Sequence, residues 1–281
     1  MDFLMYSTLA NVQDLVELKD NDTTVIVDCR YDLSDEKAGY RKYLSSHIPG
    51  AVYADLKFDL SGPPVTDHGR HPMPVQEKMI TVFSGLGISN SSQVVLYDDS
   101  YGAVAARLWW MLRYMGHKKA AVLDGGWPAW LAAGLLKESG ERKNKPGKFS
   151  GVPATGALVL LGQVMDAGLL VDSREPERYT GEIEPIDPVP GHIPAAVNYH
   201  WRKNIGDNGL FLSSHELRKQ LLKVFNDTAP EGVVFYCGSG VTACHNLLAA
   251  AHAGLEGSRL YAGSWSEWCR EPGFPVATGV D

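Results

Sequence analysis

One cysteine stands where its thiol could act as a nucleophile. Cys237 follows the apolar run 233–236, Val-Val-Phe-Tyr, which predicts a strand, and opens the loop 237–243, Cys-Gly-Ser-Gly-Val-Thr-Ala, after which the pattern is helical. Backbone N–H groups at the start of a helix lack intrahelical partners and lie at the positive end of the helix dipole, so they stabilise an anion. We therefore expect a reactive thiolate at this position.

The residues after Cys237 are suited to surround a sulfur anion. Gly238 and Gly240 can adopt backbone angles closed to other residues, which lets successive amides converge on one atom. Ser239 and Thr242 add hydroxyl donors. The alternative is a buried structural cysteine, because free cysteine is among the most buried residue types. The succession of strand, glycine-rich turn and helix favours the reactive thiol.

The other cysteines do not head such a turn. Cys29 lies in an apolar run, Cys244 lies just inside the helix predicted after the loop, and Cys269 is near the end of the chain. Four cysteines in 281 residues, without Cys-x-x-Cys pairs, indicate neither a disulfide framework nor a zinc site. The N-terminus does not read as an export signal, so we expect a reducing, cytoplasmic setting.

Composition and charge argue against several classes of protein. Hydrophobic residues make up 44% of the chain and charged residues 21%, which is ordinary for a globular protein. No segment approaches the roughly 20 apolar residues needed to span a bilayer, so we expect no membrane partner. The net charge of −7 disfavours general nucleic-acid binding, which needs clustered Lys and Arg. An anionic substrate must then be attracted by local positive charge.

The chain repeats itself at a nearly constant offset. Matched pairs of segments are 25–30 with 169–174, each ending in Asp-x-Arg; His47-Ile48-Pro49 with His192-Ile193-Pro194; 94–97 with 233–236; and 127–130 with 265–268, each with tryptophan at both ends. Ordered matches of this kind indicate a duplicated domain of about 130 residues. We expect a first domain over 1–140, a polar linker over 141–155 and a second domain over 156–281.

Within each half, short β-branched runs alternate with helical patterns, which predicts an α/β fold. We expect each half to form a mostly parallel sheet flanked by helices. Reactive loops belong at the carboxyl ends of parallel strands, and Cys237 lies at such an end. The equivalent position in the first half is Asp98. The first half is therefore expected to be non-catalytic and to support or shape the substrate site.

Together these features resemble the rhodanese superfamily of sulfurtransferases, and in particular its two-domain members, whose second domain alone carries the catalytic cysteine. The markers are the paired Asp-x-Arg strands, the paired His-Ile-Pro segments, the loop 237–243 and the segment 263–268, Gly-Ser-Trp-Ser-Glu-Trp. The loop is the most specific. Cys-Gly-Ser-Gly-Val-Thr is the version of the 3-mercaptopyruvate sulfurtransferases, whereas thiosulfate-preferring rhodaneses carry basic residues directly after the cysteine.

The resemblance implies a ping-pong reaction without metal or organic cofactor. The Cys237 thiolate attacks the sulfur of a small anionic donor, pyruvate or sulfite leaves, and a persulfide remains on the enzyme. An acceptor, either cyanide or a thiol such as that of thioredoxin, then removes the outer sulfur. The loop amides would stabilise the charge as it moves between the sulfurs. Substrate binding is assigned to Arg178 and to the loop residues Gly238, Gly240, Val241 and Thr242.

Arg178 aligns with the family arginine that binds the donor's carboxylate or sulfonate, a task suited to a planar cation. On spacing alone, a surface arginine paired with Glu175 or Glu182 is the simpler interpretation. Family members that use mercaptopyruvate usually carry a second arginine a few residues later, but residues 182–189 contain no basic residue.

Two interpretations of this missing arginine stay open. Arg70 or Arg107 could compensate for it, or the donor is thiosulfate. The loop 237–243 favours mercaptopyruvate, because it surrounds the reacting sulfur.

In the family that the chain resembles, a histidine acts with a serine and an aspartate to activate the donor. The resemblance implies that the histidine is His47 and the serine is Ser239. Asp35 is the nearest aspartate by position. The alternative, favoured by the repeat, is that His47 and His192 each fasten a turn, since His192 has no serine loop of its own. The repeated Asp-x-Arg residues and the tryptophans recur in both halves and are expected to be structural.

Two rival functions come from other classes. A cysteine-dependent phosphatase would need an arginine six residues after the cysteine, but residue 243 is alanine. A non-catalytic sulfur-carrier or scaffold protein is possible on this fold, because the first half lacks the thiol, but the intact loop after Cys237 argues against it.

Overall fold

The computed structural model describes residues 5–63 and 69–280 and divides into two compact units. The first comprises Met1–Gly62, Pro74–Ala154 and Asp207–Leu210, and the second comprises Pro63–Met73, Thr155–Gly206 and Phe211–Asp281. None of the helices in the described ranges is long and apolar enough to cross a membrane.

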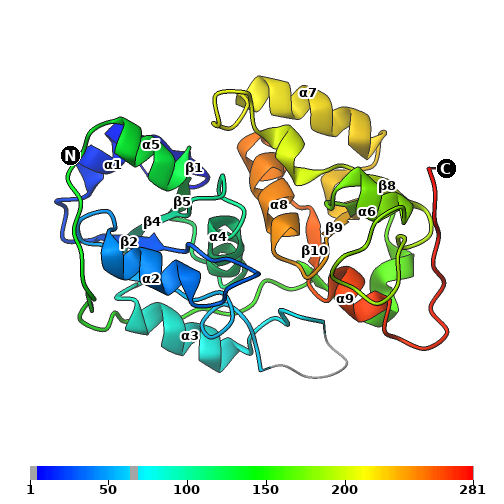
Figure 1. The fold of residues 1–281 in the computed structure, drawn as a ribbon, viewed down its shortest axis with the longest axis horizontal. Helices are drawn as coiled ribbons and strands as arrows, with labels where there is room; N and C mark the ends of the chain where they lie inside the picture. The colour runs from blue at the N-terminus through cyan, green and yellow to red at the C-terminus, as the bar shows by residue number, and fades with distance from the viewer. Residues whose placement is uncertain (1–4, 64–68, 281) are drawn as a thin grey trace. The chain divides into compact units, whose positions relative to one another are not determined.

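Each unit contains one five-stranded sheet (Figure 1). The strands of the first unit are β1 (Leu9–Ala10), β2 (Thr24–Asp28), β3 (Val52–Tyr53), β4 (Gln93–Tyr97) and β5 (Ala120–Leu123), in the order β1-β5-β4-β2-β3. Those of the second are β6 (Leu158–Val159), β7 (Leu169–Asp172), β8 (Ala196–Asn198), β9 (Val233–Tyr236) and β10 (Arg259–Tyr261), in the order β6-β10-β9-β7-β8. Both orders are the same, and every paired strand is parallel, so the predicted α/β fold and its duplication are confirmed.

Helices cover the sheet of the first unit. They are α1 (Val12–Leu18), α2 (Ala38–Ser45), α3 (Gln76–Gly85), α4 (Ala105–Tyr114) and α5 (Gly126–Ala132). α1 begins at a capping box made by Asn11 and Asp14, and it packs with α5 over Ile26 and Val95. Figure 1 shows α1 and α5 side by side. Residues on successive strand positions point to opposite faces, and α4 contacts β4 and β5.

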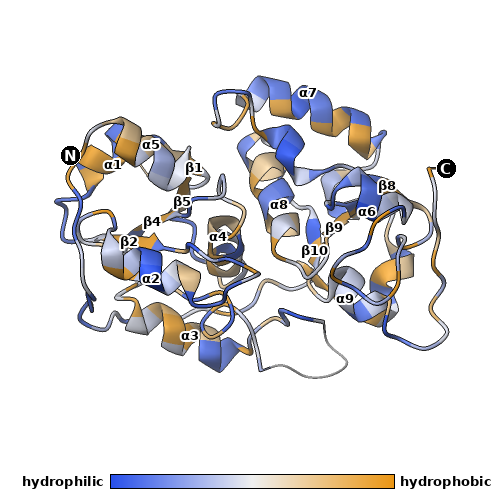
Figure 2. Cartoon of the chain, viewed as in Figure 1, coloured by the Kyte–Doolittle hydropathy of each residue, from blue (hydrophilic) through white to orange (hydrophobic). Residues whose placement is uncertain are grey.

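The second unit repeats this plan. Its helices are η1 (Leu161–Asp166), α6 (Pro176–Thr180), η2 (Trp201–Asn204), α7 (Ser214–Phe225), η3 (Pro230–Gly232), α8 (Thr242–His252) and α9 (Ser264–Trp268), where η marks a 3₁₀ helix. α8 contacts β9 and β10, while α7 packs on α8. Figure 2 shows α7 mainly hydrophilic with hydrophobic positions between, and its buried residues are Leu217, Leu221 and Phe225. The predicted structural role of the tryptophans is confirmed, since Trp127, Trp130, Trp265 and Trp268 are all buried.

The compact units differ from the expected domain limits at three segments, of which the shortest is Asp207–Leu210, assigned to the first unit. Residues of the expected linker bond to the first unit, where Gly147 N–H donates to the Ser84 carbonyl and Ala154 N–H to that of Tyr114. Residues early in the chain belong to the second unit, where Arg70 N–H donates to Ser266 Oγ at 3.1 Å. The segment that carries Arg70 therefore contributes to the unit that holds Cys237.

Candidate active site

Cys237 directly follows β9 at the carboxyl end of the sheet. Its backbone N–H donates to Ser264 Oγ at 3.1 Å, and its carbonyl accepts from Trp265 N–H at 2.9 Å. The side chain is 2% exposed, and its Sγ accepts the Gly240 N–H at an N–S distance of 3.1 Å. The loop therefore turns a backbone donor toward the sulfur, as the sequence predicted for a thiolate site.

Gly240 has to be glycine for this geometry. Its φ is +73°, in the left-handed region, and a Cβ at this position would overlap the Ala262 carbonyl oxygen. The loop is also tied to the following helix α8, since Cys244 Sγ donates to the Gly240 carbonyl at 3.3 Å. Gly240 is thus held through both its N–H and its carbonyl.

Two other cysteines lie in surroundings that disfavour their thiolates. Burial first, and then the carboxylate of Asp28, raise the pKa of Cys29 well above its ordinary value. Burial also raises the pKa of Cys269, with Asp187 adding to the effect. Both shifts disfavour these thiols as nucleophiles.

Ser239 pairs with a histidine that sequence reasoning did not select. His71 Nδ1 lies 2.8 Å from Ser239 Oγ, and both residues are 7% exposed. The segment Gly69-Arg70-His71-Pro72 offered one signal for His71, because it places two basic residues together in the first half without a counterpart in the repeat.

The structure gives His47 other contacts than Ser239, with which the resemblance paired it. His47 is fully buried in the first unit, where its Nδ1 lies 2.8 Å from the Tyr43 carbonyl and its ring stacks on Tyr43 at 4.3 Å. His192 does the same with Tyr179, at 2.8 Å and 3.7 Å. Both histidines fasten turns, which was the alternative that the repeat favoured.

Asp35 is likewise not part of a catalytic group with His47. Its carboxylate forms an exposed ion pair with Arg41 and accepts the Lys37 N–H. Asp35 lies just before the start of α2, where a carboxylate is favourable beside the positive end of the helix dipole.

Two arginines converge beside Cys237, over the Cα of Gly238. A Cβ built on Gly238 would lie 2.9 Å from Arg70 Nη2 and 3.5 Å from each terminal nitrogen of Arg178. Of the two candidates for a second arginine, Arg70 therefore lies beside Arg178. Arg107 does not, because it is buried in the first unit, with its guanidinium 3.4 Å from the Leu60 carbonyl.

Carboxylates hold both guanidiniums in place. Arg178 donates from Nη2 to Glu184 at 2.8 Å and to Asp187 at 3.3 Å, and Arg70 bonds to the same Asp187. The alternative interpretation paired Arg178 with Glu175 or Glu182. The structure has the pair with Glu175 at 3.9 Å, and the shorter contacts of Arg178 are to Glu184 and Asp187. The Arg178 side chain is 13% exposed, and its terminal nitrogens face Gly238.

The repeated Asp-x-Arg residues form buried ion pairs, as predicted. Arg30 lies 2.5 Å from Asp28 in the first unit and Arg174 lies 2.6 Å from Asp172 in the second. Each guanidinium also lies 4.8 Å from a tryptophan ring, Trp127 or Trp265. These pairs join the end of a strand to the α5 or α9 helix of the same unit.

The first unit fills the position of the thiol with a carboxylate. Asp98 is fully buried, and its two oxygens accept the N–H groups of Ser100, Gly102, Val104 and Ala105 at 2.8 to 2.9 Å. Burial raises the pKa of Asp98, and these N–H groups oppose that rise. The amides that a strand-loop-helix turn directs at an anion are thus already occupied here.

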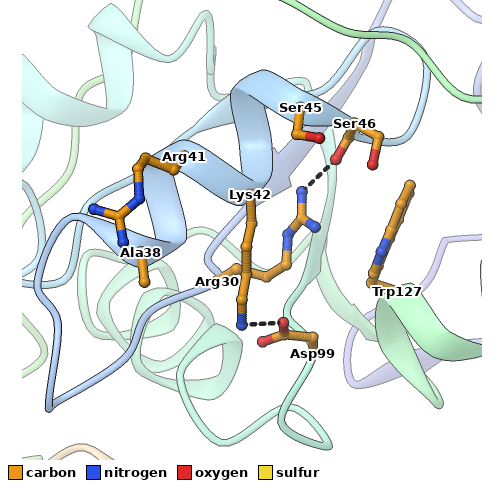
Figure 3. A pocket seen from close by; sticks show the side chains of 8 residues that line it. All are labelled: Arg30, Ala38, Arg41, Lys42, Ser45, Ser46, Asp99 and Trp127. Atoms are coloured by element: carbon orange, nitrogen blue, oxygen red, sulfur yellow. Dashed lines mark hydrogen bonds and ion pairs between the residues drawn. The ribbon is translucent and has the colours of Figure 1, made fainter.

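The first unit has a cavity of ≈ 560 Å³ next to this loop, and Lys42 and Asp99 are among the residues that line it (Figure 3). Lys42 precedes Tyr43 as Arg178 precedes Tyr179, and it bonds to Asp99 at 2.7 Å. Asp99 in turn stands where the second unit has Gly238. The lysine is therefore neutralised within its own unit. Across the described ranges, no group of three His, Cys, Asp or Glu side chains is placed to hold a metal ion.

Comparison with known proteins agrees with this geometry. The sequence profile of the rhodanese-like domain matches residues 11–133 and 159–271. The chain belongs to the rhodanese-like family. The first matched stretch contains β2 to β5 and the second contains β7 to β10, and the family resemblance inferred from the sequence is confirmed.

Relatives within the rhodanese-like family are similar along nearly the whole chain. "Probable 3-mercaptopyruvate sulfurtransferase" of Pseudomonas aeruginosa is 45% identical over 280 residues, covering 96% of this chain and 98% of its own. A provisionally named thiosulfate sulfurtransferase of Mycobacterium tuberculosis is 38% identical and covers 92% of each chain. The solved structure of 3-mercaptopyruvate sulfurtransferase from Leishmania major has a TM-score of 0.84 and 32% identity, covering 95% of this chain and 76% of that one.

Proposed function

We propose that this protein is a sulfurtransferase that takes sulfur from 3-mercaptopyruvate through a persulfide on Cys237. The observation that carries the proposal is the pair of guanidiniums of Arg70 and Arg178 beside Gly238. Gly238 directly follows Cys237, whose Sγ accepts a hydrogen bond from a backbone N–H. A donor with a carboxylate at one end and a sulfur at the other matches these two features. The names of the relatives support the same class of reaction.

The reaction is balanced without any added oxidant or reductant. The Cys237 thiolate attacks the donor sulfur, a sulfur–sulfur bond forms, and the bond between sulfur and the methylene carbon breaks. The electron pair of that bond goes to carbon, which takes up the hydrogen carried by the donor sulfur and leaves as the methyl group of pyruvate. The enzyme keeps the sulfur as a persulfide anion.

Ser239 and His71 are suited to move that hydrogen. The serine hydroxyl lies two residues from the thiol, and the imidazole lies 2.8 Å behind it. A hydroxyl backed by an imidazole can take a proton from one atom and return it to another, and groups of this kind accelerate proton transfer by about 10²- to 10⁴-fold. His71 therefore takes the role that the sequence assigned to His47.

The loop amides carry the second half of the cycle. Gly240 N–H already faces Cys237 Sγ, and Asp98 shows that four N–H groups of the equivalent loop can converge on one anion. In the second unit, Gly238, Gly240, Val241 and Thr242 would surround the terminal sulfur of the persulfide. An acceptor such as cyanide or a thioredoxin-like thiol then removes that sulfur. All four cysteines are free, which suits a reducing, cytoplasmic setting.

Thiosulfate is the second candidate donor. The arginine pair can also bind a sulfonate, but the residues after Cys237 are glycine and serine rather than basic. The two donors are compared by their kcat/KM values with cyanide as the acceptor. We expect 3-mercaptopyruvate to give the higher value. A clearly higher kcat/KM for thiosulfate would reverse the assignment. If neither donor is turned over, the alternative of a sulfur-carrier or scaffold protein is favoured.

A further inference from the structure

Three arginines from distant parts of the chain meet on one buried carboxylate. Asp187, whose side chain is inaccessible to solvent, bonds through Oδ1 to Arg70 and through Oδ2 to Arg178 at 3.3 Å. Arg270 Nη1 also lies 3.3 Å from Oδ1. No other side chain is shared between Arg70 and Arg178 among the ion pairs of the described residues.

Glu184 fixes Arg178 from its other side. Arg178 donates to Glu184 from Nε at 3.1 and 3.2 Å and from Nη2 at 2.8 Å. Glu184 itself is held by Arg174 at 3.1 Å and by the N–H groups of Ile186 and Asp187. The guanidinium of Arg178 is therefore locked, and the position of Arg70 relative to it depends on Asp187.

The charges of this cluster do not cancel. Arg70, Arg178 and Arg270 face the two buried carboxylates of Asp187 and Glu184, which leaves one positive charge, while Arg174 already has Asp172 as its buried partner. Glu175 lies 3.9 Å from Arg178, but its side chain is half exposed, so solvent screens its charge. Arg270 has a side chain that is 37% exposed and does not approach Gly238 as closely as the other two. It therefore adds charge to the site from behind Asp187.

We propose that Asp187 and Arg270 determine the preference of this site for anionic donors. Asp187 is a positioning residue that keeps the guanidiniums of Arg70 and Arg178 together over Gly238, against their mutual repulsion. Arg270 supplies the excess positive charge that the donor carboxylate neutralises. This inference rests on the proposed function, because it concerns the same donor site.

The role of Arg270 is tested with two alkylating reagents of nearly equal size. Iodoacetate carries a carboxylate and iodoacetamide a neutral amide, so the ratio of their rates at Cys237 reports attraction of an anion without any sulfur transfer. We expect the wild-type ratio to exceed that of glutathione by about tenfold, and Arg270→Gln to lower it at least about threefold, because the cluster becomes neutral.

Two controls isolate the charge of Arg270. Arg270→Lys keeps the charge and should keep most of the wild-type ratio. Arg218→Gln removes the same charge from an arginine that bonds to the carbonyls of Ala253 and Gly254, outside the cluster, and should leave the ratio unchanged. An unchanged ratio in Arg270→Gln overturns the inference and leaves the proposed function intact. Failure of Cys237 to react with either reagent contradicts both.

The role of Asp187 is tested by the sign of a change in KM. Asp187→Asn removes a negative charge, so a purely electrostatic role would lower the KM for 3-mercaptopyruvate. Loss of positioning would instead raise the KM. We expect the KM to rise by about tenfold or more, while kcat stays within about threefold of wild type. Asp187→Glu should recover part of the loss. A lower KM, or a fall in kcat alone with the folded fraction unchanged by circular dichroism, would overturn the positioning role.

Discussion

Asp98 places its carboxylate in the first unit where Cys237 places its thiol in the second. Each follows the strand that pairs with the Asp-x-Arg strand. Four backbone N–H groups after Asp98 donate to its carboxylate, and one, that of Gly240, donates to Cys237 Sγ. The same turn therefore serves two purposes. In the first unit it is closed by an internal anion and stabilises the fold, and in the second it holds the thiol that we propose exchanges sulfur.

This relationship predicts that Asp98→Asn destabilises the protein without altering the donor site. The asparagine amide would turn an NH₂ group toward N–H donors that now reach a carboxylate oxygen, and a buried donor left without an acceptor costs roughly 1–3 kcal/mol. Urea unfolding measures the loss. Asp99→Asn is the matched control, since its partly exposed pair with Lys42 should contribute less than about 1 kcal/mol. Equal stability of both variants would contradict the assigned role of Asp98.

The contact between His71 and Ser239 predicts strongly non-additive effects. His71→Gln and Ser239→Ala should each lower kcat by about 10²-fold, because each breaks the same proton relay. The double variant should be hardly slower than either single variant. Single-turnover formation of pyruvate measures the step directly. Multiplying effects in the double variant would show that the two side chains act separately. His47→Gln, in contrast, should reduce stability and leave the rate of the folded fraction unchanged.

Gly238 is predicted to be a specificity position for the donor. Its φ is not positive, so alanine fits the backbone, but the new methyl group would lie 2.9 Å from Arg70 Nη2 and fill the space between the arginines. Gly238→Ala should fold normally and raise the KM for 3-mercaptopyruvate by about tenfold or more. Gly85→Ala, where a Cβ meets no other atom within 4 Å, is the control. An unchanged KM in Gly238→Ala would argue against donor binding between Arg70 and Arg178.

Much of this site could be predicted from the sequence, because several of its residues are close together in the chain. Cys237, the glycines after it and the strand before it are neighbours in the chain, so their spacing alone predicts the turn. Arg178 was found by resemblance. His71 could not be chosen over His47, because a contact between residues 71 and 239 depends on where a long segment lies after folding.

The acidic residues of the donor site were missed for a similar reason. Residues 182–189 stood out for lacking an arginine, whereas the structure shows that Glu184 and Asp187 in this stretch organise arginines from elsewhere. Arg270 gave no signal at all, since it resembles any arginine near a helix end. Tertiary ion-pair networks of this kind leave no periodic pattern in a sequence.

The pKa of Glu184 predicts a pH-dependent contribution to stability. Burial alone would raise this pKa, but the hydrogen bonds from Arg178 and the N–H groups of Asp187 and Ile186 hold it below its ordinary value. A carboxylate with a lowered pKa stabilises the fold above its unfolded value of about 4.3, and the contribution is lost as the pH falls through the folded value. Wild type should therefore exceed Glu184→Gln in unfolding free energy at pH 6–7, and the gap should close below about pH 4. A gap that does not vary with pH would contradict this linkage.

The central claim is that Cys237 carries the transferred sulfur, and intact mass spectrometry tests it most directly. After incubation with 3-mercaptopyruvate and no acceptor, the wild-type protein should gain the mass of one sulfur atom, located at Cys237 by peptide mapping and removed by cyanide. Cys237→Ser should gain none, while Cys269→Ser should behave as wild type. Pyruvate released without any added sulfur on the protein, or sulfur found on another cysteine, would contradict the account.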